Sequence, residues 1–520
     1  MGEENLARQA ELALDRQGDH DSLFFEGQWH SSGSLADRAA RFATGLADLG
    51  VRPGDRLLVL MANCPEVLIT YSAAWRAGAV VTPLIFLVSE DELRNALVDS
   101  GAVGVVTTTE FLPKVSAAVK GDGEVSGAPG VRFVVVPGAA DHPEAAPGVT
   151  VLDFAQVAAA APGSIADRSG ADLAALLYTG GTTGRSKGVP LSHANLFWAG
   201  WAAHQASVRA NVVTSVLPLP LAHAYGLLVF CGGFHRGEGA RLILMRWFDP
   251  AGWVQLAEQH RAQARALVPS MIQMLLGQPL EQADLSELIA ISSGAAPLPE
   301  EARREFEKRV PTATIYEGYG CTESATLISA NPYGARRAGS VGLPVAGCEV
   351  SIQDDFGQVL PAGQDGEICA RSPGVMTGYW RTADGAANVL AGGWLRTGDI
   401  GHLDEDGYLY VVDRKKDLIL RGGFNVFPRD VEEVLVAHPV VALAGVVGRP
   451  DVRLGQEVVA YVSLRPGASA TVEELTEHAM RHLGANKYPR QITIVPAIPL
   501  TSVGKLDRKK LRQWGAEGSG

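Results

Sequence analysis

Short, wholly apolar runs that alternate with helix-type stretches constrain the fold of this chain most strongly. Between about Asp55 and Ile315, β-type runs such as LLVLM (57–61) and RLILM (241–245) are separated by segments with helical periodicity. This alternation predicts α/β layers with largely parallel sheets. Runs that are apolar throughout predict sheets that are covered on both faces. Other expected strands lie at 80–85, 104–108, 132–136, 173–179 and 266–270, and expected helices lie at 65–77, 194–209, 253–260 and 299–309.

The rest of the chain divides into three segments that differ in composition and hydrophobic pattern. Residues 121–170 are rich in Gly, Ala, Pro and Asp, which predicts a long surface excursion. After about Asn331, Gly-punctuated turns between short β runs predict a more antiparallel, barrel-like region. Beyond DRKKD (413–417), two expected helices (428–437 and 472–483) and the strands around them predict a compact α+β unit.

With 520 residues the chain is too long for one hydrophobic core, so several domains are expected. We place the main boundary in the charged stretch at 414–417. The prediction is a large N-terminal domain, residues 1–414, followed by a small, mobile C-terminal domain, residues 415–520.

Charge and cysteine content limit the partners and the compartment. The net charge is −12, from 45 basic and 57 acidic residues, and no long basic run is present. Nucleic acid is therefore not expected as the main partner. The five cysteines form no CxxC pair, which favours reduced thiols in a cytoplasm. The N-terminus lacks an apolar signal core, and prolines break the most apolar stretch (214–232), so we expect a soluble cytoplasmic protein without a membrane span.

The most informative motif is YTGGTTGRSKG (178–188), which directly follows the expected strand at 173–179. Consecutive glycines let backbone N–H groups converge on one point, and the two threonine hydroxyls and Lys187 add donors and charge. This combination favours a phosphate-binding nest, although a Gly-rich turn taken alone is more often a plain surface loop. A Walker A loop is excluded because Arg-Ser-Lys follows Gly184, and no GxGxxG fingerprint is present.

Together with five further motifs in the same order, this loop resembles the phosphate-binding motif of the adenylate-forming superfamily. That superfamily comprises acyl- and aryl-CoA synthetases, adenylation domains of nonribosomal peptide synthetases and luciferases, and the chain is most similar to a stand-alone acyl-CoA synthetase. The chain departs from the family's pattern at Gly180, where Ser is usual, and at Ser186, where Pro is common. Both changes are expected to loosen the loop. The further motifs are SGAAP (293–297), YEGYGCTES (316–324), GWLRTGD (393–399), GYLYVVDRKKDLI (407–419) and PLTSVGKLDR (499–508).

The resemblance implies a two-step reaction that uses ATP, Mg²⁺ and coenzyme A. ATP first converts a carboxylic acid to acyl-AMP with release of pyrophosphate, and the thiol of coenzyme A then displaces AMP. The large domain is expected to hold ATP and the acid, and the small domain is expected to carry the catalytic lysine. The residues that the resemblance assigns to ATP binding are Thr179, Gly180, Gly181, Thr182, Thr183, Gly184, Lys187, Gly294, Ala295, Ala296, Glu317, Gly318, Tyr319, Gly320, Asp399 and Arg414.

Four residues are expected to act in catalysis. Lys505 offsets the negative charge that gathers when a carboxylate attacks a phosphate. Glu323 supplies a hard oxygen ligand for Mg²⁺ and lies beside Thr322. His223, in LPLAHAYG, matches a position that bounds the acyl pocket. Taken alone, each of these residue types is more often structural or solvated, so the roles depend on the motifs.

Two further roles follow from the resemblance. Lys416 matches the hinge about which the small domain rotates between the two steps. The loop that contains Arg421, Gly422, Gly423 and Phe424 is expected to border the route of coenzyme A.

The identity of the acid is only partly constrained by the sequence. LAHAYG carries no Asp that would hold a substrate ammonium, which favours a hydrophobic acid (fatty, aryl or polycyclic) over an amino acid. Three alternatives stay open: transfer to a separate acyl carrier protein, an oxidative fate of the adenylate, and a nucleotide-binding regulator that has lost catalysis. Free coenzyme A is the preferred acceptor, and a homodimer is possible.

Overall fold

The structure, a computed structural model, describes most of the chain and divides it into two compact units. Unit 1 comprises Met1–Leu298, Ala302–Val350 and Ala370–Leu395, and unit 2 comprises Pro299–Glu301, Ser351–Cys369 and Arg396–Gly520. Gly180, Gly181, Thr182, Thr183, Gly184 and Gly423 lie outside the described residues. The described residues are 5–121, 127–128, 130–138, 145–179, 186–207, 212–382, 389–422, 424–485, 487–501 and 505–517.

Within the described part of unit 1, a seven-stranded sheet has the order β7-β6-β5-β3-β4-β8-β9. All pairs are parallel except the β8–β9 hairpin at one edge. The side chains of β5 and β6 are wholly buried, as the continuous apolar runs predict. The strands are β3 (Arg56–Leu60), β4 (Val80–Pro83), β5 (Gly104–Thr107), β6 (Phe133–Val136), β7 (Thr150–Asp153), β8 (Leu173–Thr179) and β9 (Lys187–Ser192).

A second sheet, of nine described strands, has the order β16-β15-β14-β13-β12-β10-β11-β1-β2. Its interior from β1 to β14 is parallel, and its two ends are antiparallel. These two sheets confirm the predicted parallel α/β architecture. The strands are β1 (Asp21–Phe25), β2 (Gln28–Ser31), β10 (Thr214–Leu217), β11 (Arg241–Leu244), β12 (Ala264–Leu267), β13 (Ala290–Ser293), β14 (Thr314–Tyr319), β15 (Ser329–Ala330) and β16 (Leu343–Pro344).

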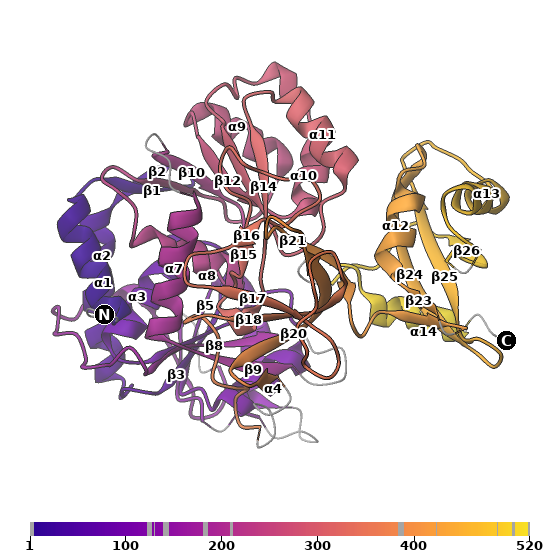
Figure 1. Cartoon of the computed structure of the whole chain (residues 1–520). Coiled ribbons are helices and arrows are strands. Elements are labelled where there is room, and N and C mark those ends of the chain that lie inside the picture. The colour runs from indigo at the N-terminus through magenta and orange to yellow at the C-terminus, as the bar shows by residue number, and fades with distance from the viewer. Residues whose placement is uncertain are drawn as a thin grey trace. The chain divides into compact units, whose positions relative to one another are not determined.

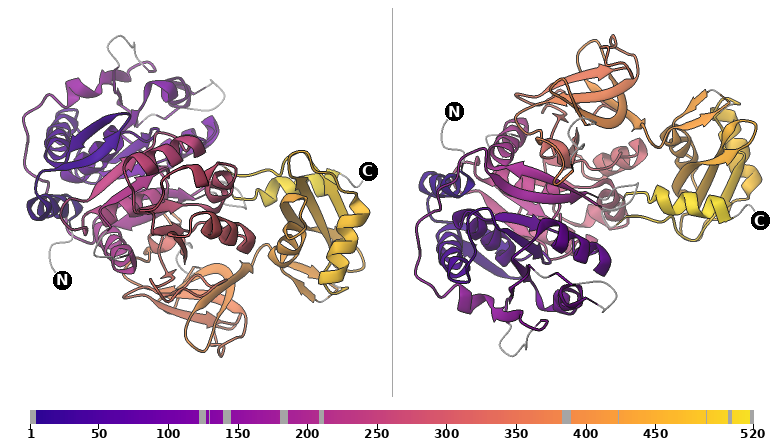
Figure 2. Two further views of the ribbon diagram at one scale, coloured as in Figure 1. Left: turned by 90° about the horizontal axis from the view of Figure 1, so that it is seen from above. Right: turned by 90° about the horizontal axis from the view of Figure 1, so that it is seen from below.

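Helices pack along both sheets, and α1, α2 and α3 lie side by side (Figures 1 and 2). One buried core includes Leu57 of the first sheet, Leu244 of the second sheet and Trp75 of α3, so the two sheets share that core. The helices are α1 (Leu6–Gln17), α2 (Ser32–Asp48), α3 (Pro65–Arg76), α4 (Glu90–Ser100), α5 (Leu112–Lys120), α6 (Phe154–Val157), α7 (His193–Ser207), α8 (Ala224–Gly233), α9 (Pro250–Gln259), α10 (Pro269–Leu276) and α11 (Glu300–Arg309).

Two expectations need correction. The segment 121–170 is not one surface excursion, because β6, β7 and α6 lie within it and β7 pairs with β6. The strand expected at 266–270 ends at Leu267, because Pro269 occupies the first turn of α10, where its fixed φ and missing N–H are tolerated. Strand β9 was not expected, so the Gly- and Thr-rich loop joins two antiparallel strands.

A third sheet has the described order β17-β18-β20-β19, with β21 paired to β20. The pairs β19–β20 and β20–β21 are antiparallel, in agreement with the more antiparallel region predicted after about Asn331. The strands are β17 (Glu349–Gln353), β18 (Gly366–Arg371), β19 (Leu390–Ala391), β20 (Trp394–Leu403) and β21 (Leu409–Arg414).

The C-terminal part of unit 2 is the predicted α+β arrangement. Its sheet has the described order β23-β22-β25-β24, and β26 pairs with β25. The helices expected at 428–437 and 472–483 are present, and α14 is an additional helix. The elements are β22 (Ile419–Arg421), β23 (Phe424–Val426), α12 (Pro428–Val436), β24 (Val441–Asp451), β25 (Gly455–Leu464), α13 (Val472–His482), β26 (Gln491–Ile494) and α14 (Arg508–Glu517).

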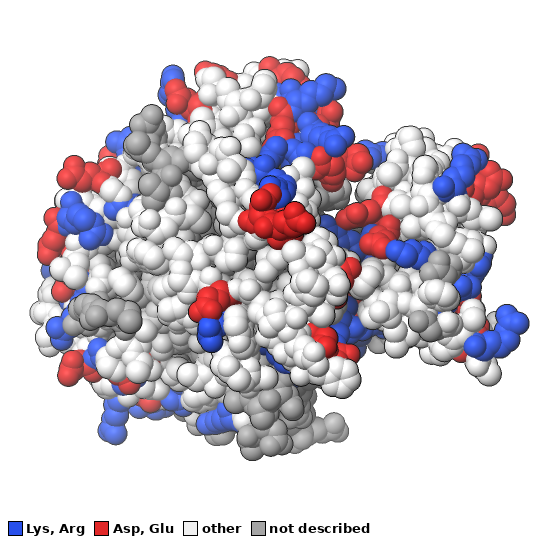
Figure 3. Space-filling view, viewed as in Figure 1, with Lys and Arg blue, Asp and Glu red and all other residues white. Residues whose placement is uncertain are grey.

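The surface and the helix lengths bear on possible partners. Acidic and basic side chains are interspersed on the face shown in Figure 3. None of the helices in the described ranges is both long and apolar enough to cross a membrane.

Candidate active site

The base of the predicted phosphate loop is an antiparallel hairpin. Thr179, the last residue of β8, pairs with Lys187, the first residue of β9, and its Oγ1 donates to the Lys187 carbonyl at 3.4 Å. The residues between Thr179 and Ser186 lie outside the described part of the chain. The structure therefore places the two ends of the loop, and the expected nest of N–H groups stays a prediction.

Contacts to distant segments hold both ends of this hairpin. The Tyr178 hydroxyl donates to Asp99 of α4 at 2.6 Å. The Trp380 backbone N–H donates to the carbonyl of Gly188 at 2.8 Å, and its indole N–H donates to the Asp99 carbonyl at 3.1 Å. Burial and the bond to Asp99 raise the pKa of Tyr178, so its hydroxyl stays protonated and keeps donating. Trp380 and Asp99 thus hold the two strands that flank the phosphate loop from outside the motif.

Tyr379, which the sequence did not single out, connects the loop to the expected metal ligand. Its hydroxyl donates to Glu323 Oε1 at 2.8 Å. The Nζ atom of Lys187 lies 4.8 Å from the centroid of the Tyr379 ring, within the range of a cation–π contact. Burial, followed by the nearby Glu323 carboxylate, raises the pKa of Tyr379 and keeps its hydroxyl a donor at neutral pH.

Glu323 fits a single-carboxylate site for Mg²⁺. It lies in the 3₁₀ turn η3 (Thr322–Ser324) after β14, is half-buried, and its carbonyl accepts the Met376 N–H at 2.9 Å. Among the described residues, no group of three or more His, Cys, Asp or Glu side chains is arranged to hold a metal. A cation here would use one carboxylate together with phosphate oxygens and water, as Mg²⁺ commonly does.

The expected nucleotide-binding turns lie at the carboxyl ends of two adjacent parallel strands. Ser293 of β13 pairs with Glu317 of β14, so the turns after both strands start at the same edge. A Cβ at Gly294 would lie 3.2 Å from the Gly318 carbonyl oxygen, and a Cβ at Gly320 would lie 1.9 Å from the Thr326 carbonyl oxygen. Gly320 is therefore required by close packing, and the edge is where ligands of open α/β sheets bind.

This edge also includes Ala295, Ala296 and Tyr319. Ala295 adopts a left-handed conformation with φ of 71°, which turns the backbone sharply after β13. Tyr319 pairs with Ser329 of β15 and is half-buried. The structure thus brings together residues that the sequence assigned to ATP from two separate motifs.

His223 caps helix α8. Its Nδ1 accepts the Tyr225 N–H at 3.1 Å, so the neutral ring carries its proton on Nε2. The Tyr225 hydroxyl donates to the Ser292 carbonyl of β13 at 3.2 Å, which places the first turn of α8 beside the edge described above. The structure accounts for His223 as a helix cap, and its predicted contact with the acid remains a proposal.

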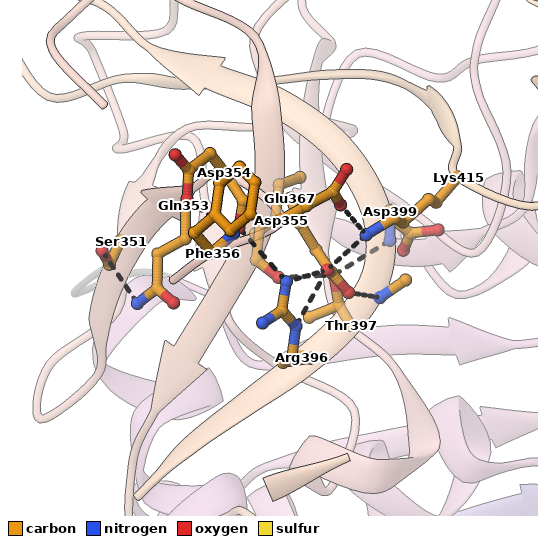
Figure 4. Close-up of polar contacts among 12 residues, drawn as sticks. Ser351, Gln353, Asp354, Asp355, Phe356, Glu367, Arg396, Thr397, Asp399 and Lys415 are labelled. Atoms are coloured by element: carbon orange, nitrogen blue, oxygen red, sulfur yellow. Dashed lines mark hydrogen bonds and ion pairs between the residues drawn. The ribbon is translucent and has the colours of Figure 1, made fainter. Parts of the chain in front are cut away.

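In unit 2, Asp399 and Arg414 face each other across β20 and β21. They are register partners, and Arg414 Nε lies 3.5 Å from Asp399 Oδ1. The Asp399 backbone N–H donates to Thr397 Oγ1 at 3.2 Å, and Gly398 takes a positive φ of 73°. These two predicted ribose contacts therefore lie together on a bent strand (Figure 4 shows Asp399).

The predicted hinge lies between anchored neighbours. Lys416 is exposed, whereas the next residue, Asp417, contacts Arg512 at 2.6 Å and Arg508 at 3.5 Å on α14. On the preceding side, the buried Asp413 accepts the backbone N–H of Arg429 at 2.9 Å.

The predicted coenzyme A loop is only partly exposed. Arg421 donates to both carboxylate oxygens of Glu457 at 2.5 and 3.1 Å, and both side chains are largely buried. The Gly422 N–H donates to the Leu454 carbonyl at 2.7 Å. Phe424 is 58% exposed, so it is the side chain of this group that is available to a ligand.

Lys505 lies on a turn that the flanking residues close. Its backbone N–H donates to Thr501 Oγ1 at 3.2 Å, its carbonyl accepts the Thr501 N–H at 2.7 Å, and Leu500 bridges Leu506. Arg508, three residues later, donates to both carboxylate oxygens of Glu432 at 2.5 and 3.0 Å. The lysine turn is therefore fastened to α12 within unit 2.

Comparisons with known proteins cover almost the whole chain. The model of the AMP-binding enzyme family matches residues 8–380, and that of the AMP-binding enzyme C-terminal domain matches residues 430–505. A feruloyl-CoA synthase from Amycolatopsis sp. is 34% identical over 92% of each chain. A long-chain-fatty-acid–CoA ligase from Yersinia pestis is 33% identical over 98% of this chain and 94% of its own length. The solved amide bond synthetase McbA from Marinactinospora thermotolerans has a TM-score of 0.86 at 30% identity, covering 98% of this chain and 99% of its own.

Proposed function

The chain belongs to the AMP-binding enzyme family, and on that basis we propose that it joins a hydrophobic carboxylic acid to coenzyme A at the expense of ATP. The predicted membership of the adenylate-forming superfamily is confirmed, and the relatives make the chain an AMP-forming acid–thiol ligase. The observation that carries the proposal is the full-length family match, supported by the cluster of Lys187, Tyr379 and Glu323 at the phosphate loop.

In the first step, a carboxylate oxygen of the acid attacks the α-phosphorus of ATP, and the bond to pyrophosphate breaks. We propose that Lys187 and the loop from Thr179 to Gly184 bind the β- and γ-phosphates and offset their negative charge. Lys505 contacts the attacking carboxylate and the α-phosphate, where two anions approach each other. Glu323, aligned by Tyr379, holds Mg²⁺, which when bound neutralises phosphate charge.

We assign nucleotide recognition to residues of four predicted motifs. The turns that contain Gly294–Ala296 and Glu317–Gly320 receive the adenine, and Tyr319 offers a ring for stacking. Asp399 accepts the ribose hydroxyls, with Arg414 beside it. Thr322 and His223 complete the site next to the reacting carboxylate.

In the second step, the thiol sulfur of coenzyme A attacks the acyl carbon and the thiol loses its proton. The bond between the acyl carbon and the phosphate oxygen of AMP breaks, and AMP leaves. The small domain, residues 415–520, rotates about Lys416 to admit the thiol past Arg421–Phe424. Asp417 is bonded to Arg512 of α14 within this domain, whereas the bond from the Arg429 N–H to Asp413 joins the two sides of the swivel and must break when the domain rotates.

The acid is of the fatty or aryl type. The similar proteins are named for feruloyl and long-chain fatty acyl products. The first turn of α8, beside the acid site, presents His223, Ala224 and Tyr225 and no carboxylate that would hold an ammonium group. We further propose a cytoplasmic location, because all five cysteines are free and four of them are buried. A homodimer can be tested by size-exclusion chromatography with light scattering.

ATP–pyrophosphate exchange with a panel of fatty, aryl and polycyclic acids tests the first step. Coenzyme A, an acyl carrier protein and a simple amine, added in separate arms, identify the acceptor, since a similar structure is an amide bond synthetase. Thioester formed only with coenzyme A supports the proposal. Product formed only on the carrier protein or the amine would assign a different acceptor. No exchange with any acid would favour a nucleotide-binding regulator.

Lys505→Ala tests the assignment of the catalytic lysine, and Lys509→Ala, at an exposed position on α14, is the control. We expect Lys505→Ala to lose adenylation by about two to three orders of magnitude, typical for removal of one transition-state charge contact. The variant should still make thioester from supplied acyl-AMP. Equal loss in both half-reactions would exclude the assigned role.

A further inference from the structure

Glu367 is a buried carboxylate of β18 with an unusual set of partners. Its side chain is 7% exposed. Oε2 accepts Arg396 Nε at 2.9 Å, Arg396 Nη2 at 2.7 Å and Lys415 Nζ at 3.2 Å, while Oε1 accepts the Gly398 N–H at 3.2 Å (Figure 4). Burial opposes ionisation, but the bonds from Arg396 and Lys415 outweigh it and lower the pKa of Glu367. The group is therefore an anion at neutral pH.

One side of this cluster fixes the turn that carries Asp399. Gly398, whose N–H is held by Glu367, immediately precedes Asp399. Thr397 Oγ1 accepts the Asp399 N–H at 3.2 Å and donates at 2.8 Å to the carbonyl of Ile368, the residue after Glu367. The backbone of the turn that carries Asp399 is thus held by two consecutive residues of β18.

The other side of the cluster fixes the start of the hinge. Lys415 Nζ bonds to Glu367 and, at 2.6 Å, to the exposed Asp355, and its backbone N–H donates to the Gly398 carbonyl at 2.9 Å. Because an exposed ion pair contributes little, the buried bond to Glu367 is the stronger anchor. Asp417 is held by α14 on the far side, so Lys416 alone separates the two anchors.

We propose that Glu367 is a positioning residue that couples the ribose carboxylate Asp399 to the hinge at Lys416. It does so through the shared Arg396–Lys415 cluster, and it touches neither ATP nor the acid. The inference rests on the proposed function, in which Asp399 holds the ribose and Lys416 is the swivel. With Glu367 ionised, a nucleotide on Asp399 restrains the Gly398 turn, and the restraint reaches Lys415 through the same carboxylate as well as through the bond from the Lys415 N–H to the Gly398 carbonyl. Without the Glu367 charge only the backbone link is left, so the Asp399 turn loosens and the restraint on Lys415 weakens.

The test compares Glu367→Gln, Lys415→Met and the double variant, with Glu349→Gln as the matched control. Glu349 forms an exposed ion pair with Arg371. Glu367→Gln preserves the side-chain shape but removes the charge. Hydrogen–deuterium exchange of residues 396–399 and 414–417, with and without ATP, reads the coupling directly, and the two half-reactions are measured separately.

We expect ATP to protect both segments in the wild type and in Glu349→Gln. In Glu367→Gln, ATP should protect 414–417 less than in the wild type, and the KM for ATP should rise about tenfold, a typical size for coupling between sites. Lys415→Met should keep the KM for ATP and reduce only the protection at 414–417, and the double variant should match Glu367→Gln.

Protection of 414–417 by ATP in Glu367→Gln equal to that in the wild type would overturn the proposal. So would a uniform loss of both half-reactions with wild-type coupling, which indicates a purely structural role. If Glu367→Gln does not fold, Lys415→Met decides, and protection there equal to that in the wild type overturns the proposal. If the wild type shows no ATP–pyrophosphate exchange with any acid, the proposed function fails. Hydrogen–deuterium exchange still measures the coupling between ATP and residues 414–417 in that case.

Discussion

Removal of the Arg508 guanidinium is the sharpest test of how the lysine turn is held. Arg508 makes the bidentate pair with Glu432, donates to the Val446 carbonyl at 2.7 Å and lies 3.5 Å from Asp417. The Glu432 side chain is 11% exposed and its other contact is the Val446 N–H at 2.8 Å. Arg508→Met keeps an unbranched apolar stem but removes the guanidinium and leaves the Glu432 carboxylate buried without its cation.

The expected cost follows from this geometry. Breaking a buried ion pair by removing one partner costs about 3–5 kcal/mol, a large share of a domain's stability of about 5–15 kcal/mol. Asp417 keeps its 2.6 Å contact with Arg512, so Glu432 is the carboxylate that loses its charged partner. Adenylation should fall as well, because the turn that carries Lys505 loses its attachment to α12.

The pH dependence of the defect has a definite sign. Burial already raises the pKa of Glu432 in the folded protein, and loss of Arg508 raises it further. A carboxyl group whose pKa is higher in the folded than in the unfolded state stabilises the fold when it is protonated. That contribution to the free energy of unfolding is lost as the pH rises through the folded pKa. The destabilisation by Arg508→Met should therefore be largest at neutral pH and smaller at acidic pH.

Urea unfolding followed by circular dichroism, with hydrogen exchange of β24 and β25 as the local measure, gives the free energy. Arg481→Met is the control, since Arg481 and Glu477 form an exposed pair on α13 whose loss should cost less than about 1 kcal/mol. A cost for Arg508→Met no greater than that of the control, or a defect that grows on acidification, would refute the reasoning.

Three further predictions concern the site. Tyr379→Phe keeps the ring beside Lys187 but loses the bond to Glu323, so the Mg²⁺ concentration for half-maximal exchange should rise about tenfold, as for one hydrogen bond to a charged group; an unchanged Mg²⁺ titration would contradict this. Gly320→Ala places a Cβ against the Thr326 carbonyl and should cost about 1–3 kcal/mol and weaken ATP binding by calorimetry, whereas Gly237→Ala, in open space, should not. Lys416→Pro fixes φ and should impair thioester formation more than adenylation in separate half-reaction assays; equal impairment would argue against a swivel there.

The position of the active-site edge was predictable in part. The apolar runs of β3, β5 and β8 predict buried parallel strands because only a sheet covered on both faces tolerates them. The motifs after β13 and β14 then meet at one edge, since parallel neighbours end on the same side. Gly320 was assigned to ATP binding through the YEGYGCTES motif, and the structure shows in addition that a side chain cannot fit there against the Thr326 carbonyl.

The contacts that align these residues could not be predicted from the sequence. Tyr379 lies 56 residues from Glu323, and Lys415 lies 48 residues from Glu367. Tyrosine, glutamate and lysine at such positions have no periodicity or spacing that links them. Strand β9 was likewise not expected, and its pairing with β8 places it at the edge of the first sheet.

The sequence by itself determined the family, the parallel α/β layers and the order of the catalytic motifs, because hydrophobic pattern and motif chemistry are local properties. Only the tertiary structure decided which groups orient the functional residues. The bonds of Tyr379 to Glu323, of Gly398 and Lys415 to Glu367, and of Arg508 to Glu432 are long-range contacts. Their partners are brought within hydrogen-bond distance by the packing of whole strands and helices.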